Sequence, residues 1–84
     1  MRLLFSESAL KDLSRLPTTM QRRIVNKLEE IAQYPNPLSL ARPLSGYHGF
    51  VRYRVGMYRI VTEPTRQTLI IHIVEKRDKA YRDL

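Results

Sequence analysis

The segment that most constrains the fold of this chain is residues 52–60, which read Arg-Tyr-Arg-Val-Gly-Met-Tyr-Arg-Ile. Apolar and charged side chains alternate before Gly56, which is the period of a β-strand with one buried face. Gly56 tolerates the positive φ that a two-residue hairpin turn requires, and β-favouring residues resume at Tyr58. The segment therefore predicts a tight β-hairpin with its turn at Gly56-Met57.

This turn sets which side chains face one another across the hairpin. Arg54 lies opposite Arg59, and Arg52 lies opposite Val61, so one face is apolar and the other carries three arginines. Like charges directly opposite each other destabilise a sheet unless something compensates them. We therefore expect an external polyanion to bind this face.

A second hairpin extends the same pattern. We expect strands at residues 50–55, 58–63 and 68–75, with a four-residue loop between the last two. This loop length predicts pairs of Glu63 with Thr68, Val61 with Ile70, and Arg59 with His72. Strict alternation then assigns Leu69, Ile71 and Ile73 to the core face, and Ile70, His72 and Val74 to the basic face.

The first part of the chain predicts one strand and two amphipathic helices. Residues 2–5 read as a strand, and Ser6 is a suitable N-cap for a helix that ends before Pro17. Thr18 and Gln21 have the spacing of a capping box that opens a second helix, which ends at Tyr34 because Pro35 follows. Residues 35–49 read as a loop rich in turn residues. The expected apolar faces comprise Ala9, Leu10, Leu13 and Leu16 in the first helix, and Ile24, Leu28 and Ile31 in the second.

These elements predict an α+β fold in the order β-α-α-β-β-β. Two N-terminal helices pack on one face of a four-stranded, mainly antiparallel sheet. A chain of 84 residues is expected to form a single domain over residues 1–84 with one modest core.

The charge balance indicates the kind of partner. The chain carries 15 Lys and Arg against 8 Asp and Glu, a net charge of +7, and 11 of the cations are arginines. Arginine is suited to bidentate recognition of phosphate, so we expect nucleic acid or an acidic protein partner, the alternative being a basic but inert surface. Cysteine is absent, and no apolar run reaches the roughly 20 residues of a membrane helix. The apolar start is too short for a signal peptide, so we expect no membrane association and a cytoplasmic location.

Three sequence motifs occur in a definite order. Leu44-Ser45-Gly46 precedes the first hairpin, residues 52–61 form that hairpin, and residues 76–82 read Lys-Arg-Asp-Lys-Ala-Tyr-Arg. Together with the order of elements, they resemble the RelE/ParE superfamily of bacterial toxins, whose pattern runs roughly L-x-G, R-x-R-x-G-x-Y-R, then a basic pair and a Tyr. The resemblance covers nearly the whole chain.

The resemblance implies a function and a set of residues. Members of the RelE-like mRNA interferase branch are ribosome-dependent endoribonucleases that cut mRNA in the decoding site, and each is neutralised by a cognate antitoxin. We therefore expect a toxin of a type II toxin–antitoxin system that cleaves mRNA through attack of the 2′-hydroxyl on phosphate, without metal or other cofactor. Its partners would be mRNA, the ribosome and an acidic antitoxin protein. The residues that match the catalytic positions of the branch are Arg52, Arg54, Arg59, Arg77 and Tyr81.

The chemistry of these residues leaves the proton transfers unassigned. Arginines align a phosphate and stabilise negative charge, but they are poor proton donors and acceptors. Lys76, His72 and Lys79 are further candidates for RNA contact, and His72 has a side chain suited to acid–base work, although a histidine within a strand more often packs or is solvated. Glu63 and Glu75 are expected to balance neighbouring cations. Two histidines and scattered acids give no metal-ligand spacing.

Two other functions remain open at this point. A ParE-like inhibitor of DNA gyrase shares the fold and lacks nuclease activity, and it generally lacks the full basic and aromatic set. A non-catalytic RNA-binding relative would use the same arginines only to hold phosphate. Induced expression discriminates among them through cleaved mRNA, a DNA-damage response, or no effect on growth.

Overall fold

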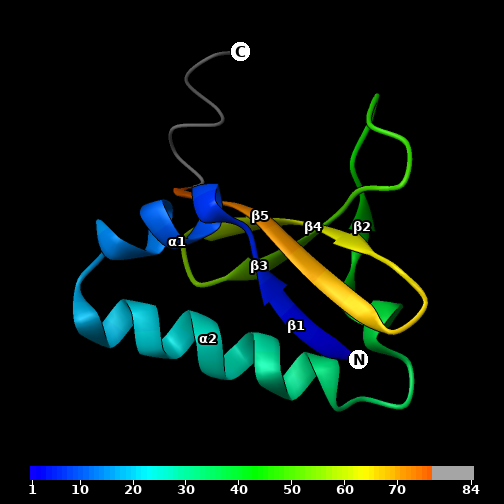
Figure 1. Ribbon diagram of the computed structural model, residues 1–84, viewed down its shortest axis with the longest axis horizontal. Helices are drawn as coiled ribbons and strands as arrows, with labels where there is room; N and C mark the ends of the chain where they lie inside the picture. The colour runs from blue at the N-terminus through cyan, green and yellow to red at the C-terminus, as the bar shows by residue number, and fades with distance from the viewer. Residues whose placement is uncertain (77–84) are drawn as a thin grey trace.

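The structure is a computed structural model, and it describes residues 1–76. One strand and two helices precede a loop region and a three-stranded meander (Figure 1). The elements are β1 (Arg2–Phe5), α1 (Glu7–Ser14), α2 (Thr18–Ala32), the 3₁₀ helix η1 (Pro37–Leu40), β2 (Arg42–Pro43), β3 (Val51–Val55), β4 (Tyr58–Pro64) and β5 (Thr68–Lys76).

The strands form one mixed sheet in the order β1-β5-β4-β3-β2. β1 runs parallel to β5, and every other neighbouring pair is antiparallel. Helix α1 packs against β5 and β1, and α2 packs against β1 and β3. The predicted α+β fold with two helices on one face is confirmed, but the sheet has five strands rather than four. The additional strand, β2, lies within the stretch predicted to be only a loop.

The two helix starts differ in how well the sequence predicted them. Ser6 is the N-cap of α1, and its Oγ accepts a hydrogen bond from the amide of Ala9 at 3.0 Å. The predicted capping box is wrong. Thr18 is the first residue of α2 rather than its N-cap, and the N-cap is Pro17, which makes no side-chain hydrogen bond. Gln21 instead donates through Nε2 to the carbonyl of Leu16 at 2.8 Å, which ties α2 to the end of α1.

The core lies between the helices and the inner face of the sheet. Leu10 was expected there but is 55% exposed, because it lies on the outer side of α1. Burial of the remaining apolar stripe provides the main favourable term for folding, as expected for amphipathic helices on a sheet. The buried cluster comprises Ala9, Leu13, Ile24, Leu28, Ile31, Tyr53, Val55, Ile60, Leu69, Ile71 and Val74.

The β3–β4 hairpin has the predicted register. Val55 pairs with Tyr58, Arg54 with Arg59, and Arg52 with Val61, so Gly56-Met57 is a two-residue turn. Since successive side chains in a strand point to opposite faces, the arginines lie on the face turned away from the core.

The β4–β5 hairpin does not have the predicted register. Thr65 and Thr68 close the turn through a hydrogen bond of 2.7 Å from the Thr65 amide to the Thr68 carbonyl. Strand β4 therefore extends to Pro64, which pairs with Leu69, and Glu63 pairs with Ile70 rather than with Thr68.

An irregularity in the same hairpin changes the faces of β5. Thr62 pairs with Ile71 while Val61 pairs with Ile73, so His72 is the extra residue of a β-bulge. Beyond the bulge the alternation is reversed. Val74 is 5% exposed and belongs to the core, whereas Ile73 is 38% exposed, the opposite of the predicted assignment.

Candidate functional site

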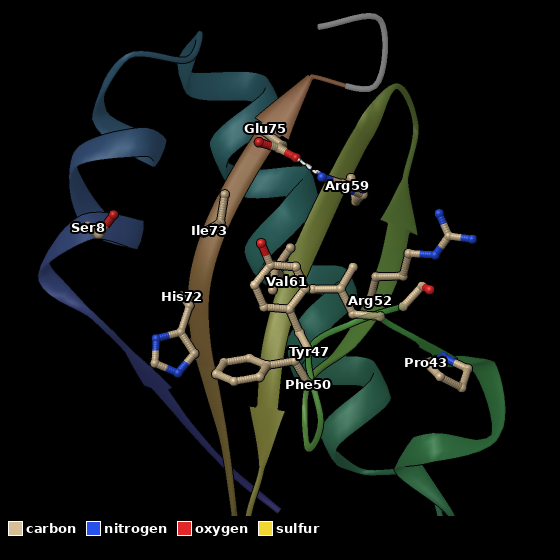
Figure 2. A pocket seen from close by; sticks show the side chains of 12 residues that line it. Ser8, Pro43, Tyr47, Phe50, Arg52, Arg59, Val61, His72, Ile73 and Glu75 are labelled. Carbon is tan, nitrogen blue, oxygen red and sulfur yellow. Dashed lines mark hydrogen bonds and ion pairs between the residues drawn. The ribbon is translucent and has the colours of Figure 1, made fainter. Parts of the chain in front are cut away.

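A cavity of about 740 Å³ lies on the face of the sheet turned away from the core (Figure 2). Its floor consists of side chains from β3, β4 and β5, and its wall is the loop between β2 and β3. The N-terminal turn of α1 contributes at one side. The lining residues are Ser8, Pro43, Leu44, Ser45, Tyr47, Phe50, Arg52, Arg59, Val61, His72, Ile73 and Glu75.

Arg59 is held in place by Glu75 at one end of the cavity (Figure 2). Its Nε donates to Glu75 Oε1 at 2.9 Å, and its Nη2 donates to the same oxygen. The two side chains are 29% and 32% exposed, so the pair is partly shielded from water. Glu75 therefore compensates the charge of Arg59 within the sheet, as predicted for its role. This contact uses the N–H of Nε and one N–H of Nη2, so the second N–H of Nη2 and both N–H groups of Nη1 remain as donors for a second anion.

The arginines extend beyond the cavity to the edge of the sheet. Arg52 lines the cavity, and the register places Arg42 of β2 directly opposite it. Arg54 pairs with Arg59 in the register, but its side chain lines a separate hollow at the sheet edge, beside Arg23 of α2. The cationic surface is thus broader than the hairpin alone predicts. Arg42 was missed because the two-residue strand that positions it has no alternating pattern.

The bulge in β5 places His72 in the cavity. An ordinary register would have separated His72 and Ile73 onto opposite faces, but both side chains line this cavity. The Nε2 of His72 lies 2.9 Å from Glu63 Oε1, which fixes the orientation of the imidazole ring. Glu63 thus has the predicted role of a partner for a basic neighbour.

Helix α1 holds the backbone of this bulge. The Ser6 amide donates to the carbonyl of Ile71 at 2.9 Å, and Ser6 Oγ donates to the carbonyl of His72 at 3.3 Å. The amide of Val74 donates to Asp12 Oδ2 at 3.0 Å. Beyond the end of β1, side chains of Ser6 and Asp12 therefore provide the hydrogen bonds to backbone groups of β5 that a paired strand would provide.

The loop between β2 and β3 consists of two successive β-turns. The Tyr47 amide donates to the carbonyl of Leu44 at 3.1 Å, and the Phe50 amide donates to the carbonyl of Tyr47 at 3.2 Å. Gly46 and Gly49 occupy the third position of these turns with φ of 80° and 87°. This position requires a positive φ in a type II turn, which glycine adopts without strain. The Leu-x-Gly motif is therefore the first of two turns that fix Tyr47 and Phe50.

Phe50 and Tyr47 are residues of the cavity that the sequence reasoning missed. The ring of Phe50 lies beside that of His72, with centroids 5.4 Å apart and planes tilted by 57° (Figure 2). Tyr47 lies on the same loop and is 64% exposed. The spacing of Tyr47 and Phe50 around Gly49 was the available signal, since it places two aromatic residues at the ends of one turn.

The structure brings together only some of the predicted site residues. Arg52, Arg59 and His72 line one cavity, while Arg54 lines the separate hollow beside α2. Lys76 pairs with Tyr58 at the end of β5, and the alternation after the bulge assigns it to the opposite face from Glu75. The remaining predicted residues, Arg77, Lys79 and Tyr81, lie outside the described residues.

Two further classes of site were searched. Within residues 1–76, no three side chains of His, Cys, Asp or Glu lie close enough together to hold a metal ion. None of the helices in that part of the chain is long and apolar enough to cross a membrane.

Comparison with known proteins identifies the family. Residues 3–81 match the family described as the ParE toxin of the type II toxin–antitoxin system parDE. The chain is 36% identical over 84 residues to toxin RelE3 of Methanocaldococcus jannaschii, with 96% of each chain covered.

Solved structures give the same result. The toxin of the RelB–RelE antitoxin–toxin complex of Methanococcus jannaschii superimposes with a TM-score of 0.70 at 29% identity, covering 96% of this chain and 98% of the other. The RelBE2 complex of Mycobacterium tuberculosis gives a TM-score of 0.74 at 25% identity, covering 90% of each chain. The sequence motifs, the fold and these relatives agree, and the chain belongs to the RelE/ParE superfamily of toxins of type II toxin–antitoxin systems.

Proposed function

We propose that this toxin arrests translation as an endoribonuclease that cleaves mRNA on the ribosome, in the cytoplasm. The observation that carries the proposal is the arrangement of Arg52 and Arg59 around one cavity on an open face of the sheet, with aromatic rings beside them. Fixed guanidinium groups suit phosphate, and exposed rings suit unpaired bases, which is the combination that single-stranded RNA requires.

The proposed reaction is attack of a ribose 2′-hydroxyl on the adjacent phosphate, which displaces the 5′-oxygen of the next nucleotide and needs no metal. Arg52 and the Nη1–Nη2 edge of Arg59 would bind the non-bridging oxygens and stabilise the additional negative charge. Glu75 would keep Arg59 in the orientation that this requires. The residues that follow β5, Arg77 and Tyr81, belong to the proposal through the family resemblance. Arg54, Lys76 and Lys79 are proposed as further contacts to RNA.

We also propose that an acidic antitoxin neutralises the toxin. The structures of relatives from Methanococcus jannaschii and Mycobacterium tuberculosis contain toxin and antitoxin together. With a net charge of +7, this chain favours an antitoxin segment of opposite charge. Such a segment would cover the arginines of the sheet face and so compete with RNA.

The alternative function is inhibition of DNA gyrase. It is favoured by the description of the matching family, which names a ParE toxin. In that case the same cationic face would bind a protein partner, and the expressed toxin would cause DNA damage while mRNA remained intact.

Induced expression of the toxin, followed by mapping of mRNA ends, tests the proposal. We expect translation to stop and cuts to accumulate in ribosome-bound mRNA. Arg52→Ala should reduce the cleavage rate by roughly 10²- to 10³-fold, the effect of removing one donor that stabilises transition-state charge. Arg52→Lys, which keeps the charge but loses the bidentate geometry, should recover only part of this activity.

Arg66→Ala is the matched control, because Arg66 is exposed in the turn between β4 and β5, outside the cavity. It should cleave like the unaltered toxin. A DNA-damage response with intact mRNA would contradict the nuclease function and support inhibition of gyrase. Equal cleavage by the Arg52→Ala and Arg66→Ala variants would show that Arg52 in the cavity does not contribute to cleavage.

A further inference from the structure

The cavity has two chemically different ends. Arg59 and Glu75 lie at one end, where β4 and β5 pair beyond the bulge. Phe50 and His72 meet at the other end, and Tyr47 lies on the loop beside them (Figure 2). We call Tyr47, Phe50 and His72 the ring cluster. Arg52 also lines the cavity. An end that carries arginine side chains and an aromatic end within one cavity match the phosphate and the base of a nucleotide.

The His72 side chain and the backbone that carries the ring cluster are held in place before any ligand binds. The bond to Glu63 Oε1 at 2.9 Å holds the His72 imidazole, and the α1 contacts hold the bulge that carries it. On the loop, the Leu44 amide donates to the carbonyl of Phe50 at 3.1 Å and closes the two successive turns. Because this backbone and the imidazole are already held, their ordering on binding costs little conformational entropy, which favours binding to the ring cluster.

Apolar side chains around this end of the cavity are exposed to solvent rather than packed in the core. Tyr47 is 64% exposed although it lies on a hydrogen-bonded loop, and Ile73 on the cavity floor is 38% exposed. The floor between the two ends is apolar, since Val61 and Ile73 pair there. A flat apolar surface beside exposed rings favours the face of a planar heterocycle. An unpaired nucleobase has this shape.

We propose that Tyr47, Phe50 and His72 form a nucleobase-binding subsite for single-stranded RNA. The base stacks against the ring cluster over Val61 and Ile73, and the phosphate attached to its nucleotide reaches Arg52 and Arg59. This inference rests on the proposed function, because it places the RNA of that reaction in the cavity. It adds a contact to the base to the phosphate contacts of that reaction.

Binding of short RNA analogues tests the subsite without requiring cleavage. The probe is a trinucleotide of single-stranded RNA with 2′-O-methyl groups, which cannot undergo 2′-hydroxyl attack. A second probe of the same length has an abasic middle position and therefore keeps the phosphates. We expect the unaltered toxin to bind the complete probe roughly tenfold more tightly than the abasic one, as stacking on aromatic side chains typically provides.

Two variants remove the rings one at a time. Phe50→Leu keeps apolar bulk and loses the π face, and Tyr47→Ala removes an exposed ring that lies outside the buried core. Each should weaken binding of the complete probe several-fold and leave binding of the abasic probe unchanged, and Phe50→Tyr should restore binding. Tyr34→Leu is the control, because Tyr34 lies beyond the end of α2, where its hydroxyl donates to Glu30.

The outcomes separate this subsite from the proposed function. Equal binding of the complete and abasic probes by the unaltered toxin overturns the subsite even if mRNA is cleaved in cells. Base-dependent binding that responds to Phe50→Leu supports the subsite even if no cleavage is found. Variants of the ring cluster that weaken binding of the antitoxin but not of RNA would assign these rings to the antitoxin interface, which also overturns the proposal.

Discussion

At the scale of single residues, Tyr53 links the core to the loop region that leads into the site. Its ring is 2% exposed within the buried cluster, and its hydroxyl donates to the carbonyl of Pro37 at 2.9 Å. Burial raises the pKa of Tyr53 above the ordinary tyrosine value, because the ionised phenolate would lose its hydration. The folded chain therefore holds this proton more strongly than the unfolded chain does.

The raised pKa predicts a loss of stability at alkaline pH. Above the ordinary tyrosine pKa of about 10, unfolded Tyr53 releases its proton while folded Tyr53 retains it. The unfolded state then binds fewer protons, so the free energy of unfolding falls as the pH rises. At pH 7 the free energy of unfolding of the Tyr53→Phe variant should be lower by about 1 kcal/mol, because the variant lacks the hydrogen bond of the hydroxyl. Its free energy of unfolding should also decline less steeply at alkaline pH.

Urea unfolding between pH 7 and pH 11 measures this difference. Tyr34→Phe removes a hydroxyl that bonds to Glu30 at the surface and serves as the control. It should retain the full alkaline decline. If Tyr53→Phe and the unaltered chain decline with the same slope, Tyr53 does not couple folding to pH.

The arginines show how far residue-level reasoning reached. Alternation and the Gly56-Met57 turn were sufficient to predict that Arg54 faces Arg59 and that Arg52 faces Val61. The same reasoning expected an external polyanion to compensate the facing arginines, whereas Glu75 compensates Arg59. This contact was not predicted because Arg59 was paired with His72. The correct partner depends on the turn closed by Thr65 and Thr68 and on the bulge.

At the scale of elements, the bulge in β5 decides which side chains enter the cavity. Residues 70–74 read Ile-Ile-His-Ile-Val, and a run this rich in β-branched residues is compatible with either register. The deciding contacts come from α1, where Asp12 Oδ2 accepts from the Val74 amide and Ser6 Oγ donates to the His72 carbonyl. A long-range contact of this kind has no signal in the local sequence. Local patterns were sufficient to predict the fold, but they could not predict this part of the site, because it depends on the long-range contacts at the bulge.

Asp12 gives a test of this role. Asp12→Ala leaves the partly buried amide of Val74 without its acceptor, which should lower the free energy of unfolding by about 1–3 kcal/mol. Asp12→Asn retains an acceptor oxygen and should recover most of this loss. Amide hydrogen exchange should show faster exchange at Val74 in Asp12→Ala, with little change at Leu69 in the other half of β5.

The same variants report on the ring cluster. If the bulge relaxes in Asp12→Ala, His72 moves relative to Phe50, and base-dependent RNA binding should weaken while Asp12→Asn retains it. Unchanged exchange at Val74 in Asp12→Ala would show that the bulge is maintained without α1.

At the scale of the whole molecule, the two faces of the sheet differ in what covers them and in their charge. The helices cover one face and bury the core, whereas the other face carries Arg42, Arg52 and Arg59 beside the cavity. The division follows from alternation in β3 and β4, which assigns every second residue to each face. Positive charge on the open face would attract both proposed ligands, RNA and an acidic antitoxin, so we expect the two to compete for it.

Association kinetics with the antitoxin test which face carries this attraction. The double variant Arg42→Ser/Arg52→Ser removes two positive charges of the net +7 from the open face. Arg15→Ser/Arg22→Ser removes two exposed positive charges from the two helices and is the matched control. Stopped-flow association at low ionic strength should be slowed several-fold more by the open-face pair, because steering acts through the nearest charges. The difference should disappear at about 1 M salt, where the Debye length is about 3 Å. If both variants are slowed equally, the attraction comes from net charge alone. A larger effect of the Arg15/Arg22 pair would place the antitoxin on the helical face.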